Sequence, residues 1–200
     1  MKQLYAILLT LFFAATGLCS DTGPARGYIV TKNGKQLTGY IGELYHTPFQ
    51  SIVVFINDFG SPYNIEAERV RGFVFTNEEG YTAFESKNCR GRWYFLRILE
   101  KGAAVNLYQS PEEEFILRFE NGILEAGTRT VTEYWLEMKD KKQPIRINSL
   151  NFRRKLRRLF KKEEAPEFRE KIGKEGYRFR DLPNIIREYN QDRALNKRQI

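Results

Sequence analysis

One histidine and two cysteines occur among the 200 residues of the sequence. Zinc sites and disulfide-rich miniproteins need more of these side chains than the chain offers. The single histidine, His46, lies in a Tyr-His-Thr-Pro segment typical of a loop, without a serine or cysteine in a nucleophile-elbow context. We therefore expect no metal, no cofactor and no histidine-centred hydrolase, and we name no catalytic residue.

The sequence also lacks a glycine-rich phosphate loop and a calcium-binding loop. The acidic run from Glu112 to Glu114 does not have the alternating spacing of calcium ligands, so a solvated loop is predicted there. Two acids far apart in the sequence could still meet in the fold and act as a pair on a glycosidic bond. A carboxylate-dependent hydrolase acting on envelope glycans or peptides is therefore the alternative function.

Long apolar runs are absent except near the N-terminus. Residues 4–15 form an apolar run of about 12 residues, which matches the hydrophobic region of a signal peptide and is too short to span a bilayer. Small residues favour cleavage after Gly17, and Ser20 offers a second position. Cys19 offers the alternative of a lipid anchor, although Leu18 stands where a small residue is preferred. We expect residues 1–20 to be an export signal and the mature chain to be periplasmic, associated with the outer membrane, or secreted.

Between residues 27 and 147, turn signals separate short stretches rich in β-branched and aromatic residues. Asn33-Gly34 and Asn121-Gly122 are dipeptides typical of type I′ hairpin turns. No helical stretch lies between the predicted strands to form a parallel crossover. The pattern predicts about ten strands in a β domain of residues 21–148, arranged as an antiparallel meander of barrel- or sandwich-like form.

The apolar period changes to that of a helix after residue 147. Ser149 is available as an N-cap, and the first predicted helix carries one narrow apolar stripe formed by Phe152, Leu156, Leu159 and Phe160. Two more helices are predicted around Phe168 and after Asp181, and the polar segment from Asn190 onward is expected to fray. The fold class is α+β, a mostly antiparallel sheet followed by about three C-terminal helices in residues 149–200.

The formal net charge of +8 is distributed unevenly along the chain. Residues 21–138 carry 12 basic and 16 acidic side chains, whereas residues 139–200 carry 20 basic and 9 acidic ones. The basic side chains are densest around the first predicted helix. The candidate residues for binding an anionic surface are Arg153, Arg154, Arg157, Arg158, Lys161 and Lys162.

A basic helix of this kind allows three interpretations. It could bind an anionic membrane surface, with its apolar residues at the interface. It could bind a polyanion, either an acidic envelope polymer or nucleic acid. Its stripe could instead pack on the β domain while its cations face water. The narrow stripe favours packing, the export signal argues against nucleic acid, and no protein partner is indicated.

Two pairs of adjacent aromatic residues, Trp93-Tyr94 and Tyr134-Trp135, stand in predicted strands. Neighbours in a strand point to opposite faces of the sheet, so one member of each pair points away from a core. An exposed aromatic ring could stack on a sugar or a peptide. Trp93 and Trp135 are therefore the candidates for aromatic contacts with a ligand.

The segment Gly27-Tyr28-Ile29-Val30-Thr31, with the later Gly39-Tyr40-Ile41, resembles the opening of an uncharacterised family of exported proteins from Bacteroidota-type bacteria. The C-terminal Tyr189-Asn190 resembles part of the terminal helix of that family. The resemblance implies a cell-envelope or secreted location and a β-rich body with a helical C-terminus, and it implies no catalytic residue and no ligand. We predict an exported cell-envelope protein, a non-enzymatic binding or structural module with a basic helical face.

Overall fold

A computed structural model describes residues 23–47, 49–78, 80–110, 113–120, 123–130, 133–141, 143–160 and 165–196, with the backbone alone in residues 113–120, in residues 123–130 and at residue 196. Four of the predicted features lie outside these residues: the export signal, Glu112 of the acidic run, the Asn121-Gly122 turn, and the pair Lys161 and Lys162. Glu113 and Glu114 begin a strand, so the solvated loop predicted for them is wrong.

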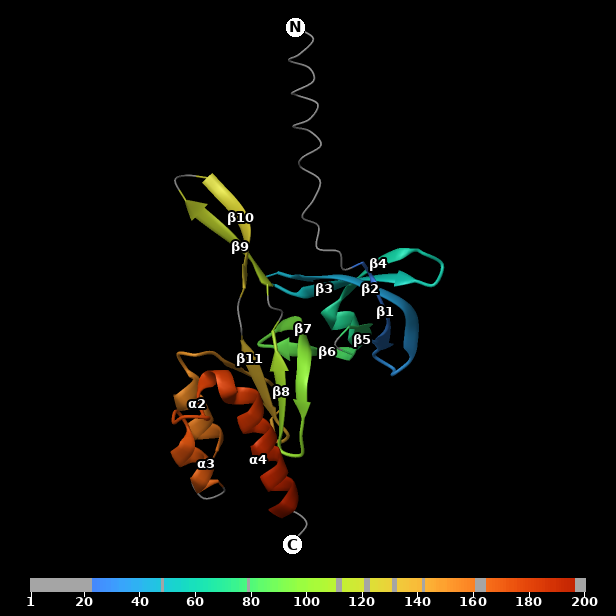
Figure 1. The fold of residues 1–200 in the computed structure, drawn as a ribbon. Coiled ribbons are helices and arrows are strands. Elements are labelled where there is room, and N and C mark those ends of the chain that lie inside the picture. Colours follow the sequence, from blue (N-terminus) through green and yellow to red (C-terminus); the bar gives the residue numbers. More distant parts are fainter. Residues whose placement is uncertain are drawn as a thin grey trace.

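Ten strands form one antiparallel sheet, which stays open and does not close into a barrel (Figure 1). The pairing order across the sheet is β12-β11-β8-β7-β6-β5-β1-β2-β3-β4. The strands are β1 (Ala25–Thr31), β2 (Gln36–His46), β3 (Ser51–Asn57), β4 (Pro62–Glu66), β5 (Val70–Asn77), β6 (Gly80–Cys89), β7 (Arg92–Lys101), β8 (Val105–Gln109), β11 (Tyr134–Met138) and β12 (Ile145–Ile147). A separate two-stranded hairpin, β9 (Glu113–Glu120) with β10 (Ile123–Thr130), projects away from this sheet in Figure 1.

The turn between β1 and β2 has a different backbone conformation from the one predicted. The turn between β1 and β2 has a positive φ of 84° at Gly34, whereas Asn33 does not have a positive φ. Gly34 N donates to Thr31 O, and Thr31 N donates to Lys35 O, which is the pattern of a type I turn followed by a glycine bulge. The predicted hairpin is thus confirmed, but the predicted type I′ turn is wrong at this position.

The first hydrophobic core, which we call the strand core, lies against one face of the sheet. The sheet bends around it, because Gln50 just before β3 forms a bridge with Trp93 of β7. A short 3-10 helix, η1 (Ala67–Arg69), contributes Ala67 to the same core. The buried residues of the strand core are Ile29, Ile41, Val53, Phe55, Ala67, Val70, Phe73 and Phe95.

Three α-helices cover the strands at the other end of the sheet and form the second core, the helix core (Figure 1). They are α2 (Phe152–Leu159), α3 (Pro166–Lys171) and α4 (Leu182–Asn196), with a 3-10 turn η2 (Phe179–Asp181) leading into α4. The predicted α+β class is therefore confirmed. Among the described residues, no helix is both long enough and apolar enough to cross a membrane.

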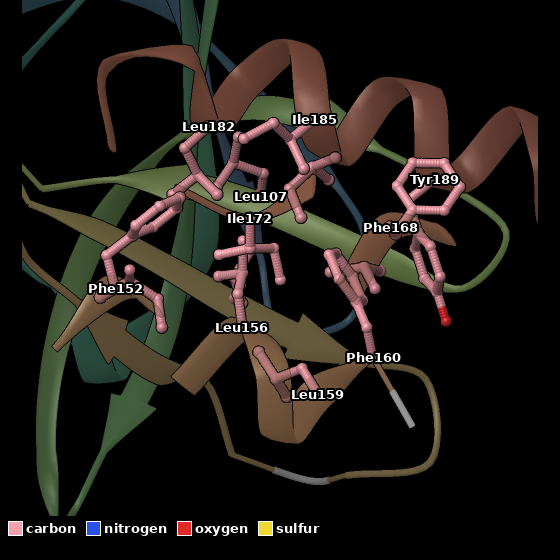
Figure 2. Packing of buried hydrophobic residues seen from close by; sticks show 14 of the residues in the cluster. Leu107, Phe152, Leu156, Leu159, Phe160, Phe168, Ile172, Leu182, Ile185 and Tyr189 are labelled. Carbon is pink, nitrogen blue, oxygen red and sulfur yellow. The ribbon is translucent and has the colours of Figure 1, made fainter. Parts of the chain in front are cut away.

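The apolar stripe of α2 lies inside the helix core. Figure 2 shows three side chains of α2 and that of Phe160, which directly follows the helix, and all four are buried in the helix core: Phe152, Leu156, Leu159 and Phe160. The helix therefore packs on the sheet through the same residues that a free amphipathic helix would expose. Its N-cap is Asn151 and not the predicted Ser149, and Asn151 accepts a hydrogen bond from Asn148 N at 3.1 Å.

The expectation that the chain frays from Asn190 onward is wrong. Asn190 is buried, and helix α4 continues to Asn196. The side-chain oxygen of Asn190 accepts hydrogen bonds from the backbone N atoms of Ala104 (3.2 Å) and Val105 (3.0 Å), and its amide nitrogen donates to the carbonyl oxygen of Val105 (2.9 Å). Asn190 thus supplies partners for the backbone of the turn between β7 and β8.

Candidate functional site

The face of the sheet opposite the helices carries the polar and aromatic side chains of the neighbouring strands. Side chains alternate along a strand, so Leu107 of β8 and Leu136 of β11 enter the helix core while Tyr108 and Trp135 lie on the opposite face. Leu96 of β7 joins them there. We call this surface the outer face, and it carries a buried polar network at one end and a basic pocket at the other.

The polar network is centred on Tyr108, which is fully buried. Its hydroxyl oxygen lies 2.8 Å from a carboxylate oxygen of Glu85 and 2.8 Å from one of Glu137, and it accepts a hydrogen bond from Lys101 Nζ at 2.8 Å. Lys87 Nζ lies 2.8 Å from Glu137 Oε1. One hydroxyl proton can serve only one carboxylate at a time, so the two lysines are what offset the charge of the paired acids.

Both carboxylates of this network remain ionised at neutral pH. Burial alone would raise the pKa of Glu85, but hydrogen bonds from Lys101 and Tyr108 and the charges of both lysines outweigh burial and lower it. The pKa of Glu137 is lowered in the same way, against burial, by Lys87 and by its hydrogen bonds from Asn106 and Tyr108. Burial and the two carboxylates raise the pKa of Tyr108. These groups are therefore not poised to donate or accept a proton near neutral pH.

The basic pocket is a cavity of about 580 Å³ on the outer face. The β6–β7 turn, the end of β2, strands β11 and β12, and helix α2 all contribute residues to it. Four lining residues are cationic: Arg90, Arg92, Arg146 and Lys155. Its volume falls in the range of small-molecule sites.

The cations of the pocket outnumber its acids. Glu133 forms an ion pair with Arg146, and no acidic partner for Arg90 or Lys155 is found in the part of the chain that the structure describes. Lys155 reaches the edge strand β12 and donates a hydrogen bond to the carbonyl oxygen of Arg146. Burial and the positive charges of Arg90, Arg154 and Arg146 lower the pKa of Lys155. An anion placed among these side chains would relieve their repulsion.

Aromatic and apolar residues also line the pocket, together with the polar side chains of Ser110 and Gln143. The ring of His46 lies 4.7 Å from that of Tyr94, and His46 Nδ1 lies 2.7 Å from Ser51 Oγ. The indole nitrogen of Trp135 is buried and has no hydrogen-bond acceptor among the described residues. A buried donor without an acceptor is uncommon and costs free energy.

Cys89 also lines the pocket, but as a neutral thiol. It is buried, and burial raises the pKa of its thiol to about 12 despite the nearby charge of Lys87. Because the thiolate is the nucleophilic form of cysteine, Cys89 does not act as a nucleophile near neutral pH. Its side chain belongs instead to the apolar wall formed with Leu96.

The structure separates the residues that the sequence nominated. Trp135 lines the basic pocket, whereas Trp93 packs against the strand core and has Lys32 Nζ 4.4 Å from its ring centre. The four described arginines of α2 are exposed and do not line this pocket: Arg153, Arg154, Arg157 and Arg158. Of these, Arg157 borders a second, shallower hollow between α2 and α3, together with Arg169 and Lys174.

Most of the cations of the pocket do not stand out in the sequence. Arg90, Arg92 and Arg146 come from a turn and two strands, and they are isolated from the dense basic run around α2. One signal was available, because Arg90-Gly91 stands between two strands where an Asn-Gly pair would be usual. No cluster of three or more histidine, cysteine, aspartate or glutamate side chains suited to a metal occurs in the described part of the chain.

Comparison of the chain with models of protein families, with curated proteins and with solved structures finds no match.

Proposed function

We propose that the protein is an exported, non-enzymatic binding module of the cell envelope that holds an acidic envelope polymer through its basic pocket. One observation carries this proposal: four cationic side chains line a cavity in which the described acid, Glu133, is already paired. The likeness of the mature N-terminus to exported proteins supports the location. The charge of residues 139–200 supports the sign of the partner.

A membrane surface is the competing anionic partner. A helix that binds a bilayer places its apolar side chains in the interface, but those of α2 are buried in the helix core. Leu150, exposed just before α2, is one apolar side chain that still accompanies the arginines there. A concave pocket with aromatic walls suits a group that enters it better than a flat lipid surface.

The hydrolase alternative requires two acids in a cavity. The two acids that meet on the outer face, Glu85 and Glu137, are held by Lys101 and Lys87 and do not line the basic pocket. Their lowered pKa values leave neither able to act as a general acid near neutral pH. Binding is therefore the function that the geometry supports better.

The test compares two double variants that each remove two positive charges. Arg90→Gln with Lys155→Gln changes the pocket, and Arg157→Gln with Arg158→Gln changes the exposed face of α2. Fluorescence anisotropy with labelled polyglutamate, polyphosphate and polygalacturonate, and pelleting with anionic liposomes, would measure binding of each. We expect the pocket variant to bind at least one polyanion about tenfold more weakly, and the helix variant to lose less than about threefold.

Binding that both variants lose equally would overturn the pocket as the site. Liposome binding that only the helix variant loses, without polyanion binding by the original chain, would favour a membrane surface. The wild-type affinity should also fall as the salt concentration rises, because the contacts are between charges.

A further inference from the structure

The turn between β6 and β7 holds an arginine in a conformation that arginine rarely adopts. Arg90 and Gly91 have φ values of 61° and 85°, and among the described residues Arg90 is the one non-glycine residue with a positive φ. A two-residue turn with two positive φ angles is of type I′, which favours asparagine followed by glycine. The side chain of arginine does not favour that backbone conformation, so the turn itself does not explain why Arg90 is there.

The reason is consistent with the place that Arg90 occupies. The turn sets Arg90 at the basic pocket, where its charge acts on Lys155 together with that of Arg146. These three cations come from a turn, a helix and an edge strand. An arginine outside the two central positions of the turn would avoid the strained backbone. The strain is therefore tied to delivering a guanidinium to this cavity.

The wall of the pocket narrows the class of ligand. Trp135 and Tyr94 offer aromatic surface from the outer face, which a simple inorganic anion would leave unused. Sugar rings combine an apolar face, which stacks on aromatic side chains, with oxygen atoms that accept hydrogen bonds. An acidic group on such a ring would complete the match with the cations.

We propose that the basic pocket recognises an acidic sugar unit, with its carboxylate or phosphate among Arg90, Arg146 and Lys155 and its ring against Trp135. This inference rests on the proposed function and specifies the polymer as a polysaccharide. Because carboxylate and phosphate make the same kind of contact with these side chains, the experiment distinguishes them with separate ligands.

The first experiment measures binding of four small probes by calorimetry and by tryptophan fluorescence. The probes are trigalacturonate, glucose 6-phosphate, neutral maltotriose and tripolyphosphate. In a Trp93→Phe background, Trp135 is the remaining tryptophan of the chain, so its fluorescence reports on the pocket alone. We expect at least one acidic sugar to bind tenfold more tightly than both maltotriose and tripolyphosphate, with a change in Trp135 emission.

The second experiment uses Arg90→Asn, which places a favoured residue in the type I′ turn. We expect the melting temperature to rise and affinity for the acidic sugar to fall at least tenfold, a combination that a purely structural arginine would not give. Trp135→Leu should lower the affinity for acidic sugars and leave the affinity for tripolyphosphate unchanged. Circular dichroism checks that this second variant is folded, and Arg90→Asn remains informative if it is not.

Equal affinity for tripolyphosphate and the acidic sugars, or unchanged affinity in Arg90→Asn, would overturn the sugar inference while leaving an anion-binding function in place. Failure of all the anionic probes and of the polyanions named above would overturn both proposals.

Discussion

The side chain of Asn190 makes three hydrogen bonds to backbone groups of a distant segment. The backbone atoms that it binds belong to Ala104, in the turn after β7, and to Val105, the first residue of β8. The carbonyl oxygen of Val105 also accepts a hydrogen bond from Gly102 N. Gly102 in the same turn lies so close that a Cβ atom there would be 1.8 Å from Asn190 Nδ2. The amide of Asn190 therefore fits in its place only because residue 102 has no side chain.

A double-mutant cycle tests this contact. Asn190→Ala should lower the free energy of unfolding by about 2 kcal/mol or more, because it leaves buried backbone groups without partners. Gly102→Ala should destabilise the original chain through the clash, but much less in the Asn190→Ala background, where the clashing amide is gone. Urea denaturation of the four proteins gives the coupling energy. Additive effects of the two substitutions would contradict the contact.

The sequence could suggest some of these residues and not others. Trp135 was identifiable because alternation in a strand forces one of two adjacent aromatic residues away from a core. Asn190 was not, because a polar residue near a chain end normally indicates fraying, and its partners lie 85 and 86 residues earlier. A polar residue that ties two distant segments together leaves no periodic pattern.

At the scale of elements, helix α2 has one apolar side that packs in the helix core and one basic side that is exposed. Eight residues are too few for a helix that is stable by itself, so its stability comes from the tertiary contacts of its buried residues. The arginines on its other side are exposed and contribute little to that stability. Its apolar and basic residues can therefore be tested separately.

Leu156→Ala should lower the free energy of unfolding by about 2–5 kcal/mol, because the side chain is fully buried in the helix core. Arg158→Gln, two positions along the same helix, should change it by less than about 0.5 kcal/mol. Chemical denaturation measures both. Similar losses in the two variants would mean that the helix is held by its charges and not by its packing.

Elements with a strong local pattern were predictable, and elements defined by pairing were not. The apolar spacing of α2 was enough to identify its buried stripe. Strand β4 was missed, because its five residues begin with Pro62 after a turn signal and are half exposed at the edge of the sheet. The type of the β1–β2 turn also escaped, since Asn-Gly can occupy either a type I′ turn or a type I turn with a glycine bulge.

At the scale of the whole molecule, one face of the sheet holds the strand core and the helix core, and the outer face carries the polar network and the basic pocket. The polar network of the outer face contributes to folding only while its carboxylates are charged. Their pKa values are lowered in the folded state, so the stabilisation is present above the ordinary carboxyl pKa and is lost as the pH falls through the folded values. At the same time, the excess of basic residues makes acid conditions increasingly repulsive.

We therefore expect the free energy of unfolding to decline as the pH is lowered below about 4.5, the usual region of carboxyl titration. Glu137→Gln should be less stable than the original chain at pH 7 and should show a shallower decline in acid. Glu68→Gln, at an exposed position, should keep the original pH profile. Urea denaturation at several pH values between 3 and 7 measures the profiles. An unchanged acid slope in Glu137→Gln would contradict the role of the network.

The class of fold followed from the order of short strands and then helices, but the site did not. The cations of the basic pocket come from separate segments that meet only through the pairing order of the sheet. Bulges such as the register shift between Ile98 and Glu100 also change which side chains share a face. Without knowledge of that register, a scattered set of arginines in strands and turns cannot be recognised as one site.

The position of β1 has a consequence for how the chain assembles. It lies in the interior of the sheet, between β2 and β5, so the first strand made is the one that joins the two halves. Strands β2 to β4 can follow it through successive hairpins, whereas the pocket needs Lys155 and the helix core needs Ile185 and Tyr189 of α4, which emerge later. Folding can thus begin before the binding site exists, and a chain cut short after its strands would lack both Lys155 of the pocket and the helices that cover β8 and β11.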